Sequence, residues 1–256
     1  KRDKEQIAPI EEFKKFAELG FAGMTIPEKY GGQKLDDISE AIVIEELSRV
    51  DPSLGVMIAV HVGLCSMTIA LSGNEEQKEK YLPKLASGEF LGAYSLSEAG
   101  SGTDAAAMVA RATDDGEHYT LNGEKMWVTN GTTADLFVLF AKVTNHPDYG
   151  KKSHGGVTCF IVEKGFEGFE IGKKEDKLGI RSSDTCTLIL NECKVPKANV
   201  LGDVGKGFPI AMNALDNSRI GIAAQGLGIA QGAYEAALKY SKERETFGKP
   251  IAAHQS

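Results

Sequence analysis

Hydroxyl groups and glycines concentrate in one segment, residues 94–104, which reads Tyr-Ser-Leu-Ser-Glu-Ala-Gly-Ser-Gly-Thr-Asp. Gly100 and Gly102 allow backbone N–H groups to approach an anion closely, and hydroxyls such as that of Thr103 can join consecutive amides in a concave set of donors. Such a loop is suited to hold a phosphate or pyrophosphate. The same composition is also typical of an ordinary Ser/Gly loop between strands, so this segment alone leaves both interpretations open.

The composition limits the classes of protein to which the chain can belong. It has 256 residues and is 42% hydrophobic, enough for a large buried core and one to three domains. Its formal net charge is -7 and it has no long basic run, so we expect no nucleic-acid binding. The four cysteines, Cys65, Cys159, Cys186 and Cys193, have neither CxxC spacing nor a nearby histidine pair, which predicts reduced thiols and no metal site.

One apolar run, residues 54–71, carries no Asp, Glu, Lys or Arg and is long enough to span a membrane. Polar His61, Ser66 and Thr68 interrupt it, and its flanks are acidic or neutral where basic anchors would be expected. We therefore predict a buried central helix and no membrane span. The first residues, Lys-Arg-Asp-Lys-Glu-Gln, lack the apolar stretch of a signal peptide and are typical of a cut end.

The first part of the chain has helical periodicity. Apolar residues recur at helical spacing over residues 10–17, and residues 36–50 repeat the pattern. Asn74 and Gln77 have the spacing of a capping box, which predicts the start of another helix at residue 75.

From about residue 91 the apolar period changes to two, and Asp115-Gly116 and Asn122-Gly123 are typical of turns between strands. We expect strands over residues 109–113, 118–123, 125–129, 136–143, 157–162 and 185–190. Because no helical pattern separates them, these strands should be antiparallel and form a barrel or sandwich.

After Gly205-Lys206-Gly207 the pattern becomes helical again, over residues 210–215 and 218–242. Gly226 and Gly228 lie inside this pattern and follow no strand, so they indicate close helix packing and not a dinucleotide fingerprint.

The predicted fold is therefore multidomain α and β. It comprises an N-terminal α-helical domain (residues 1–90), a middle antiparallel β-barrel domain (residues 91–203) and the beginning of a C-terminal helical bundle (residues 204–256). The helical pattern reaches the end of the sequence without a stop signal, so we expect the bundle to be truncated.

Four separated motifs closely resemble the signatures of the acyl-CoA dehydrogenase family. They are residues 94–104, residues 125–131 (Lys-Met-Trp-Val-Thr-Asn-Gly), residues 215–220 (Leu-Asp-Asn-Ser-Arg-Ile), and residues 244–248 (Arg-Glu-Thr-Phe-Gly) followed by Gln255. The resemblance covers essentially the whole chain, and the family's order of helical, β and helical domains matches the periodicity. Residues 172–180 and 219–225 look most like the short-chain (butyryl-CoA) and short/branched-chain members.

The resemblance implies FAD between the β domain and the C-terminal bundle. The implied cofactor contacts are Tyr94, Leu96, Ser97, Gly102, Thr103, Trp127, Val128, Thr129, Arg244, Phe247 and Gln255. Among these, Trp127 would cover the flavin ring system and the Thr129 hydroxyl would lie near N5, where a donor stabilises the reduced flavin. Arg244, Phe247 and Gln255 would contact the adenosine diphosphate half of FAD held by a neighbouring subunit of a homotetramer.

The resemblance also implies an acyl-CoA substrate, with contacts at Thr103, Ser153, Asp216 and Arg219. A carboxylate base removes the α-proton of the thioester in this family. Some members carry that Glu at the position of Ser218, whose hydroxyl has far too high a pKa to be the base. We therefore expect no catalytic base in this chain and a Glu beyond Ser256. Glu98 and Asp104 belong to the cofactor loop and are poor substitutes.

The implied activity is FAD-dependent dehydrogenation of an acyl-CoA to a trans-2-enoyl-CoA, with electrons passed to an electron-transferring flavoprotein. Two alternatives keep the fold: an acyl-CoA oxidase or related flavin monooxygenase that uses oxygen, and a non-catalytic flavin or CoA-ester binding member. The resemblance implies a soluble protein of the bacterial cytoplasm or the mitochondrial matrix.

Overall fold

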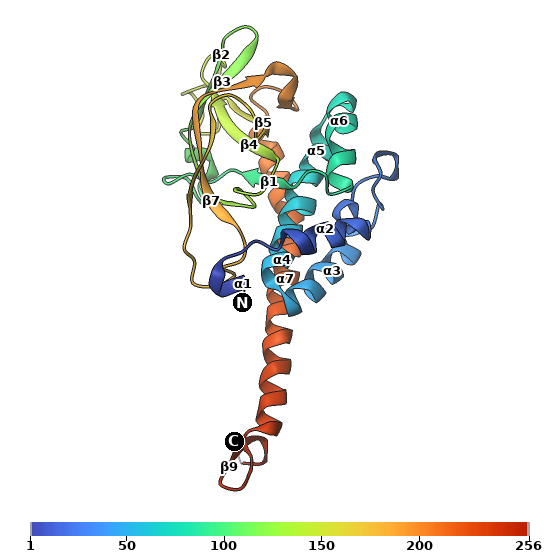
Figure 1. Ribbon diagram of the computed structural model, residues 1–256. Helices are drawn as coiled ribbons and strands as arrows, with labels where there is room; N and C mark the ends of the chain where they lie inside the picture. Colours follow the sequence, from blue (N-terminus) through green and yellow to red (C-terminus); the bar gives the residue numbers. More distant parts are fainter. Residues whose placement is uncertain (1, 255–256) are drawn as a thin grey trace.

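The computed structural model describes residues 2–254. A β region lies on one side, with the short helix α1 (Arg2–Glu5) below it, and the other helices of the N-terminal part lie on the other side (Figure 1). A long helix, α7, runs between them and projects beyond both. This arrangement of helices, sheet and helix confirms the predicted fold class. The domain boundaries at residues 90 and 203 stay a prediction.

The N-terminal part of the chain forms helices, three of which begin at a side chain that caps them. They are α1 (Arg2–Glu5), α2 (Ile10–Glu18), α3 (Asp37–Val50), α4 (Pro52–Ala59), the π-helical segment η3 (Val60–Ser66), α5 (Met67–Ser72) and α6 (Glu75–Ala86). The Asp36 carboxylate accepts a hydrogen bond from the Ser39 N–H at 2.8 Å and caps α3. The predicted capping box of Asn74 and Gln77 is confirmed at the start of α6.

The apolar run forms one continuous helical segment, α4-η3-α5, which passes through the protein interior. It is long and apolar enough to span a membrane, yet 72% of its most apolar window is buried inside the structure. Met57, Ile58 and Val62 are fully buried in it. The prediction of a buried central helix is confirmed.

The strands form one eight-stranded sheet in the order β6-β7-β3-β2-β4-β5-β8, with β1 paired to β4 beside this path. They are β1 (Gly92–Ser95), β2 (Arg111–Asp114), β3 (His118–Thr129), β4 (Leu136–Val143), β5 (Val157–Glu163), β6 (Phe169–Lys174), β7 (Thr185–Pro196) and β8 (Val200–Leu201). Most neighbours are antiparallel, as predicted, but β1 and β2 each pair with β4 in parallel. A two-residue apolar period predicts that a segment forms a strand, but it does not predict which strand pairs with it. The sequence therefore could not reveal these parallel pairings.

The Asn122-Gly123 turn is a wrong prediction. This dipeptide lies inside the continuous strand β3, where the pairing register with β7 shifts between Leu121 and Gly123. Gly123 has a φ of 143°, and a Cβ there would lie 2.9 Å from Ala110. The dipeptide therefore lies at a β-bulge, in which β7 has one residue more than β3 over the same stretch. The conformational freedom of glycine serves a bulge as well as a turn.

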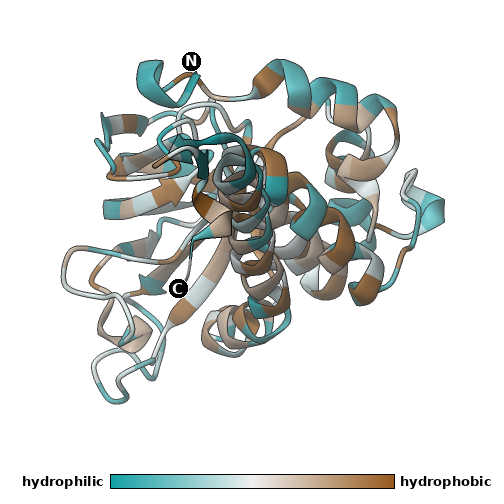
Figure 2. Cartoon of the chain, turned by 90° about the horizontal axis from the view of Figure 1, so that it is seen from below, coloured by the Kyte–Doolittle hydropathy of each residue, from teal (hydrophilic) through white to brown (hydrophobic). Residues whose placement is uncertain are grey.

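Helix α7 (Gly207–Glu243) is one helix and not the two predicted segments. A Cβ at Gly228 would lie 2.2 Å from the Glu45 carbonyl oxygen, which confirms close packing of α7 on α3. A Cβ at Gly226 would meet no described atom within 4 Å, so the prediction of close packing is wrong at Gly226. Viewed along α7, the helix carries both hydrophobic and hydrophilic residues (Figure 2), and Leu227, Tyr234, Leu238 and Tyr240 are exposed. Two short strands, β9 (Glu245–Thr246) and β10 (Lys249–Pro250), follow.

Candidate functional site

A cavity of about 500 Å³ lies where β1, β3, the segment η3 and α7 meet. It is lined by most of the residues predicted to bind a cofactor and by two predicted to bind substrate, Thr103 and Arg219. The predicted residues in its lining are Tyr94, Leu96, Ser97, Gly102, Thr103, Trp127, Thr129 and Arg219. These residues come from three parts of the chain that are distant in sequence. Their convergence on one hollow makes it the candidate ligand site.

The loop after β1 forms one wall of this cavity. Backbone hydrogen bonds of 2.9 and 3.1 Å between Glu98 and Ser101 close a tight turn, and the Ser101 hydroxyl donates to the Asp104 carbonyl at 2.9 Å. A Cβ at Gly100 or Gly102 would meet no described atom within 4 Å. Neither glycine has a positive φ, so what glycine provides here is open space for a group that approaches the backbone.

Trp127 forms the opposite wall because β3 is irregular there. The pairing register with β7 shifts between Lys125 and Val128, and Trp127 has a left-handed φ of 54°. This bulge turns the indole outward, where it is 60% exposed at the cavity, while the Val128 side chain is buried in the core. If Val128 contacts a ligand, as the sequence predicts, it can do so only through its backbone.

The polar groups at the cavity are available to a ligand. The hydroxyls of Ser97, Thr103 and Thr129 have no side-chain hydrogen-bond partner within residues 2–254. No aromatic ring of the described chain stacks on Trp127. An aromatic face beside three free hydroxyls suits a planar ligand with hydrogen-bonding edges.

Sequence reasoning missed six apolar lining residues. Ala105 and Met126 lie on the loop and on β3, and the other four come from η3 and α7: Val60, Leu64, Met212 and Leu215. Helical periodicity showed that these positions face other parts of the protein, but it cannot tell a core contact from a cavity wall. These side chains make the end of the cavity between the two helices apolar.

Asn130, from the same motif as Trp127, was also not predicted to have a role. It is fully buried with a φ of 67°, and its amide group donates hydrogen bonds to the carbonyls of Met57 at 3.1 Å and Gly92 at 3.0 Å. These bonds fix the end of β3 to α4 and β1. Asn tolerates the left-handed conformation better than most residues, which was the available sequence signal.

The predicted substrate contacts are only partly brought together. Asp216 and Arg219 form an ion pair of 3.0 Å on α7 with both side chains exposed, and only Arg219 lines the cavity. Ser153 lies in a second hollow of about 690 Å³, whose lining includes Arg111, Lys142 and Lys152. The structure therefore separates Ser153 from the first cavity.

The predicted adenosine diphosphate contacts lie far from the cavity, beyond the projecting end of α7 (Figure 1). Phe247 is 97% exposed, and Arg244 is exposed beside it. They do not reach the cavity of their own chain. Gln255 lies outside the described residues.

No carboxylate lines the cavity within residues 2–254. The Ser218 hydroxyl donates to the Leu215 carbonyl at 3.3 Å, inside its own helix. Glu98 is buried in an ion pair behind the cavity wall, and Asp104 is exposed on the loop. The prediction that the base lies outside this chain stays a prediction.

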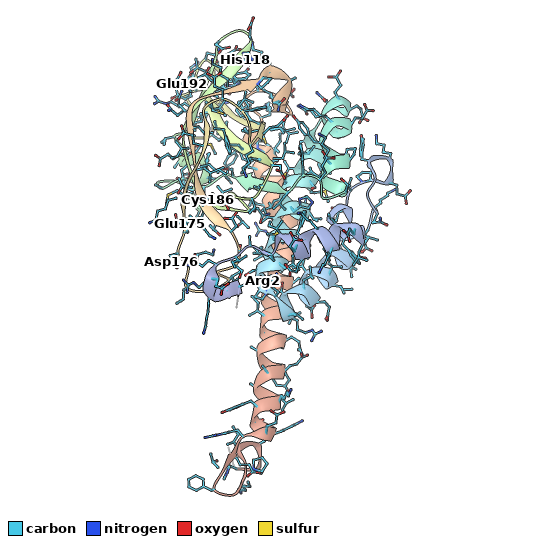
Figure 3. All side chains as sticks on the ribbon, viewed as in Figure 1. Arg2, His118, Glu175, Asp176, Cys186 and Glu192 are labelled. Atoms are coloured by element: carbon cyan, nitrogen blue, oxygen red, sulfur yellow. The ribbon has the colours of Figure 1, made fainter. Side chains whose placement is uncertain are left out.

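The other titratable residues form no metal centre in the described chain. Figure 3 shows His118 and Glu192 at one end of the sheet and Cys186 farther along it. All four cysteines are free and buried, and burial raises the pKa of Cys65 and of Cys193 to about 12.

Three family models match the chain in order. The acyl-CoA dehydrogenase N-terminal domain matches residues 1–89, the middle domain residues 93–193 and the C-terminal domain residues 205–256. A short-chain specific acyl-CoA dehydrogenase of Clostridium acetobutylicum is 47% identical over 253 residues, which is 99% of this chain and 65% of that protein.

Two solved structures are similar over nearly the whole chain. Butyryl-CoA dehydrogenase from Megasphaera elsdenii has a TM-score of 0.93 and 43% identity, covering 99% of this chain and 66% of that one. An acyl-CoA dehydrogenase from Bacillus anthracis complexed with FAD has a TM-score of 0.88 and 42% identity, covering 96% of this chain and 41% of that one.

The chain spans just under two thirds of the length of two curated relatives that it matches: 65% of the Clostridium acetobutylicum protein and 64% of an acyl-CoA dehydrogenase of Bacillus subtilis. What it does span agrees with those relatives in domain order, in sequence and in fold. By these matches and by the motifs that converge on its cavity, the chain belongs to the acyl-CoA dehydrogenase family.

Proposed function

We propose that the whole protein is an FAD-dependent acyl-CoA dehydrogenase that acts on short or short-branched acyl chains. The observation that carries the proposal is the cavity in which Trp127 faces hydroxyls without a protein partner, on the motifs that the family shares. Bound FAD would supply the acceptor for the β-hydrogen of the acyl chain, which leaves as a hydride. The short-chain specificity of the relatives supports the substrate class.

The residues present fit FAD. The exposed indole of Trp127 offers a flat apolar face, and Ser97 and Thr129 offer hydroxyl donors from the two walls. Gly102 and Thr103 lie on the open loop, which suits a pyrophosphate. We infer that these residues orient the cofactor and exclude water from one of its faces. The FAD complex of the Bacillus anthracis relative supports the assignment.

The apolar end of the cavity suits an acyl chain, because Leu64 and Met212 lie there. The exposed guanidinium of Arg219 at the rim suits the CoA portion. Asp216 would hold that guanidinium, and Ser153 would serve CoA only if the ligand extends to the second hollow. The carboxylate base, a Glu beyond Ser256, completes the reaction in this proposal.

Electrons pass to an electron-transferring flavoprotein in this proposal. The protein is a homotetramer in which Arg244, Phe247 and Gln255 serve a neighbouring subunit's FAD, and it is soluble in the bacterial cytoplasm or mitochondrial matrix. Exposure of Phe247 far from its own cavity supports the neighbour's use of it. Air oxidation as fast as substrate reduction would favour the alternative in which oxygen is the acceptor.

In the described part of the chain, residues 2–254, no carboxylate lines the cavity. This observation favours a second candidate function, that of a family member that binds a flavin or a CoA ester without catalysis. The test is anaerobic addition of butyryl-CoA to the FAD-loaded protein encoded by the whole gene. We expect loss of the flavin absorbance and formation of the enoyl product. Ligand binding without loss of absorbance would establish the second candidate.

The 256-residue chain provides the matched control. We expect it to retain FAD weakly, because part of the flavin contacts would come from a bundle and a neighbouring subunit, and not to dehydrogenate butyryl-CoA. Quenching of Trp127, the single tryptophan, reports the binding. Dehydrogenation by residues 1–256 alone would refute the placement of the base.

A further inference from the structure

A buried ion pair lies directly behind the wall of the cavity. Lys125 Nζ is 2.6 Å from Glu98 Oε1, and the two side chains are 0% and 4% exposed. Removing both charges from water is costly, and apolar residues of similar volume often give equal or greater stability. Stability alone therefore does not account for charged residues at these two positions.

The contacts of the pair show what it holds. The Lys125 ammonium also donates to the Leu96 carbonyl at 3.1 Å. The Glu98 carboxylate accepts from the Val109 N–H at 2.6 Å and from the Ala110 N–H at 3.1 Å. Glu98 thus joins the beginning of the loop to its end, and Lys125 joins the loop to β3.

The same loop and strand carry the ligand-facing residues. Leu96 and Ser97 line the cavity next to Glu98, and Trp127 lies two positions after Lys125. The Met126 N–H donates to the Ser97 carbonyl at 2.9 Å, which links the bulge of β3 to the loop. A displacement of the pair would therefore move both walls of the cavity.

We infer that Glu98 and Lys125 are positioning residues, whose ion pair fixes the loop and the bulge in the geometry that receives the ligand. The inference rests on the proposed function, since the ligand is FAD. Neither side chain lines the cavity, so both act through Leu96, Ser97 and Trp127.

The test compares K125M and E98Q with the double variant Glu98→Met/Lys125→Met. K125M leaves the Leu96 carbonyl without its donor, and E98Q leaves a buried cation without its counter-ion. We expect each single variant to weaken FAD binding about tenfold or more, because small displacements at a site have large effects. The double variant leaves no unpaired charge and so recovers part of the thermal stability that the single variants lose. The Val109 and Ala110 N–H groups and the Leu96 carbonyl still lack their partners, so it keeps the weak FAD binding.

The matched control is K80M. Lys80 pairs with Glu163 at 2.8 Å, between α6 and β5, and neither residue lines the cavity. We expect K80M to bind FAD like the wild-type chain. A double variant that regains both stability and wild-type FAD affinity would show that the pair is merely structural, and would overturn the inference.

Two measurements need no FAD and separate this inference from the proposed function. The emission of Trp127 should shift in K125M and in the double variant but not in K80M. In the same two variants the backbone amides at positions 98 and 101 should exchange faster than in the wild-type chain. Failure of the wild-type protein encoded by the whole gene to bind FAD would count against the proposed function. Unchanged emission and exchange in the folded double variant would count against the positioning role.

Discussion

His61 gives the chain a built-in dependence of stability on pH. The imidazole is fully buried in η3, where Nδ1 accepts a hydrogen bond from the Gly92 N–H at 3.0 Å and Nε2 lies 3.1 Å from the Leu85 carbonyl. Nδ1 faces a donor and Nε2 faces an acceptor, which fixes one neutral tautomer. A second proton would have to enter at Nδ1, against the Gly92 N–H.

Burial lowers the pKa of His61 to about 4 from the ordinary 6.5. Between these two pH values the unfolded chain binds a proton that the folded chain excludes, so the free energy of unfolding falls as the pH falls. A pKa difference of this size corresponds to about 3 kcal/mol between pH 7.5 and pH 4. Below about pH 4 both states are protonated and the contribution levels off.

The assay is urea unfolding of the wild-type chain and of H61Q at several pH values from 7.5 to 4. The Gln carboxamide can accept and donate hydrogen bonds but does not titrate, so the difference between the two curves isolates His61. We expect the wild-type chain to lose about 3 kcal/mol more than H61Q over this range. Parallel curves would refute the reasoning, since they would mean that His61 titrates alike in both states.

Two further predictions concern packing and backbone conformation. G228A should lower the free energy of unfolding by about 1–3 kcal/mol, because its Cβ would overlap the Glu45 carbonyl. G226A should raise the free energy of unfolding by up to about 1 kcal/mol, because alanine has the higher helix propensity and has room there. Equal effects of the two variants in urea unfolding would contradict the close packing of α7 on α3. N130G keeps the left-handed conformation but removes the bonds to Met57 and Gly92, so it should cost about 1–3 kcal/mol, and N130A should cost more because it adds backbone strain. A calorimetric scan in which N130A is the more stable of the two would show that strain at this position is unimportant.

The local signals in the sequence were strong enough to predict the helix starts and the order of the domains. The capping box at Asn74 is a short-range arrangement, and the structure confirms it. The cap at Asp36 is equally local but was found only in the structure. The motifs around residues 94–104 and 125–131 pointed to one ligand site, and their residues line one cavity. The capping box depends on residues close together in the chain, whereas the shared ligand site was implied by the family resemblance.

Only the tertiary structure decided which distant groups meet. The Asn122-Gly123 signal became a bulge because β7 pairs along the whole of β3, and β1 met β4 in parallel through a crossover that no local pattern encodes. Sequence reasoning placed Glu98 on the cofactor loop, but its pairing with Lys125 behind that loop depends on the packing of β3. Local hydrogen bonds and periodicity thus determined what each segment becomes, while burial and strand pairing determined which side chains face the ligand and which hold the wall in place.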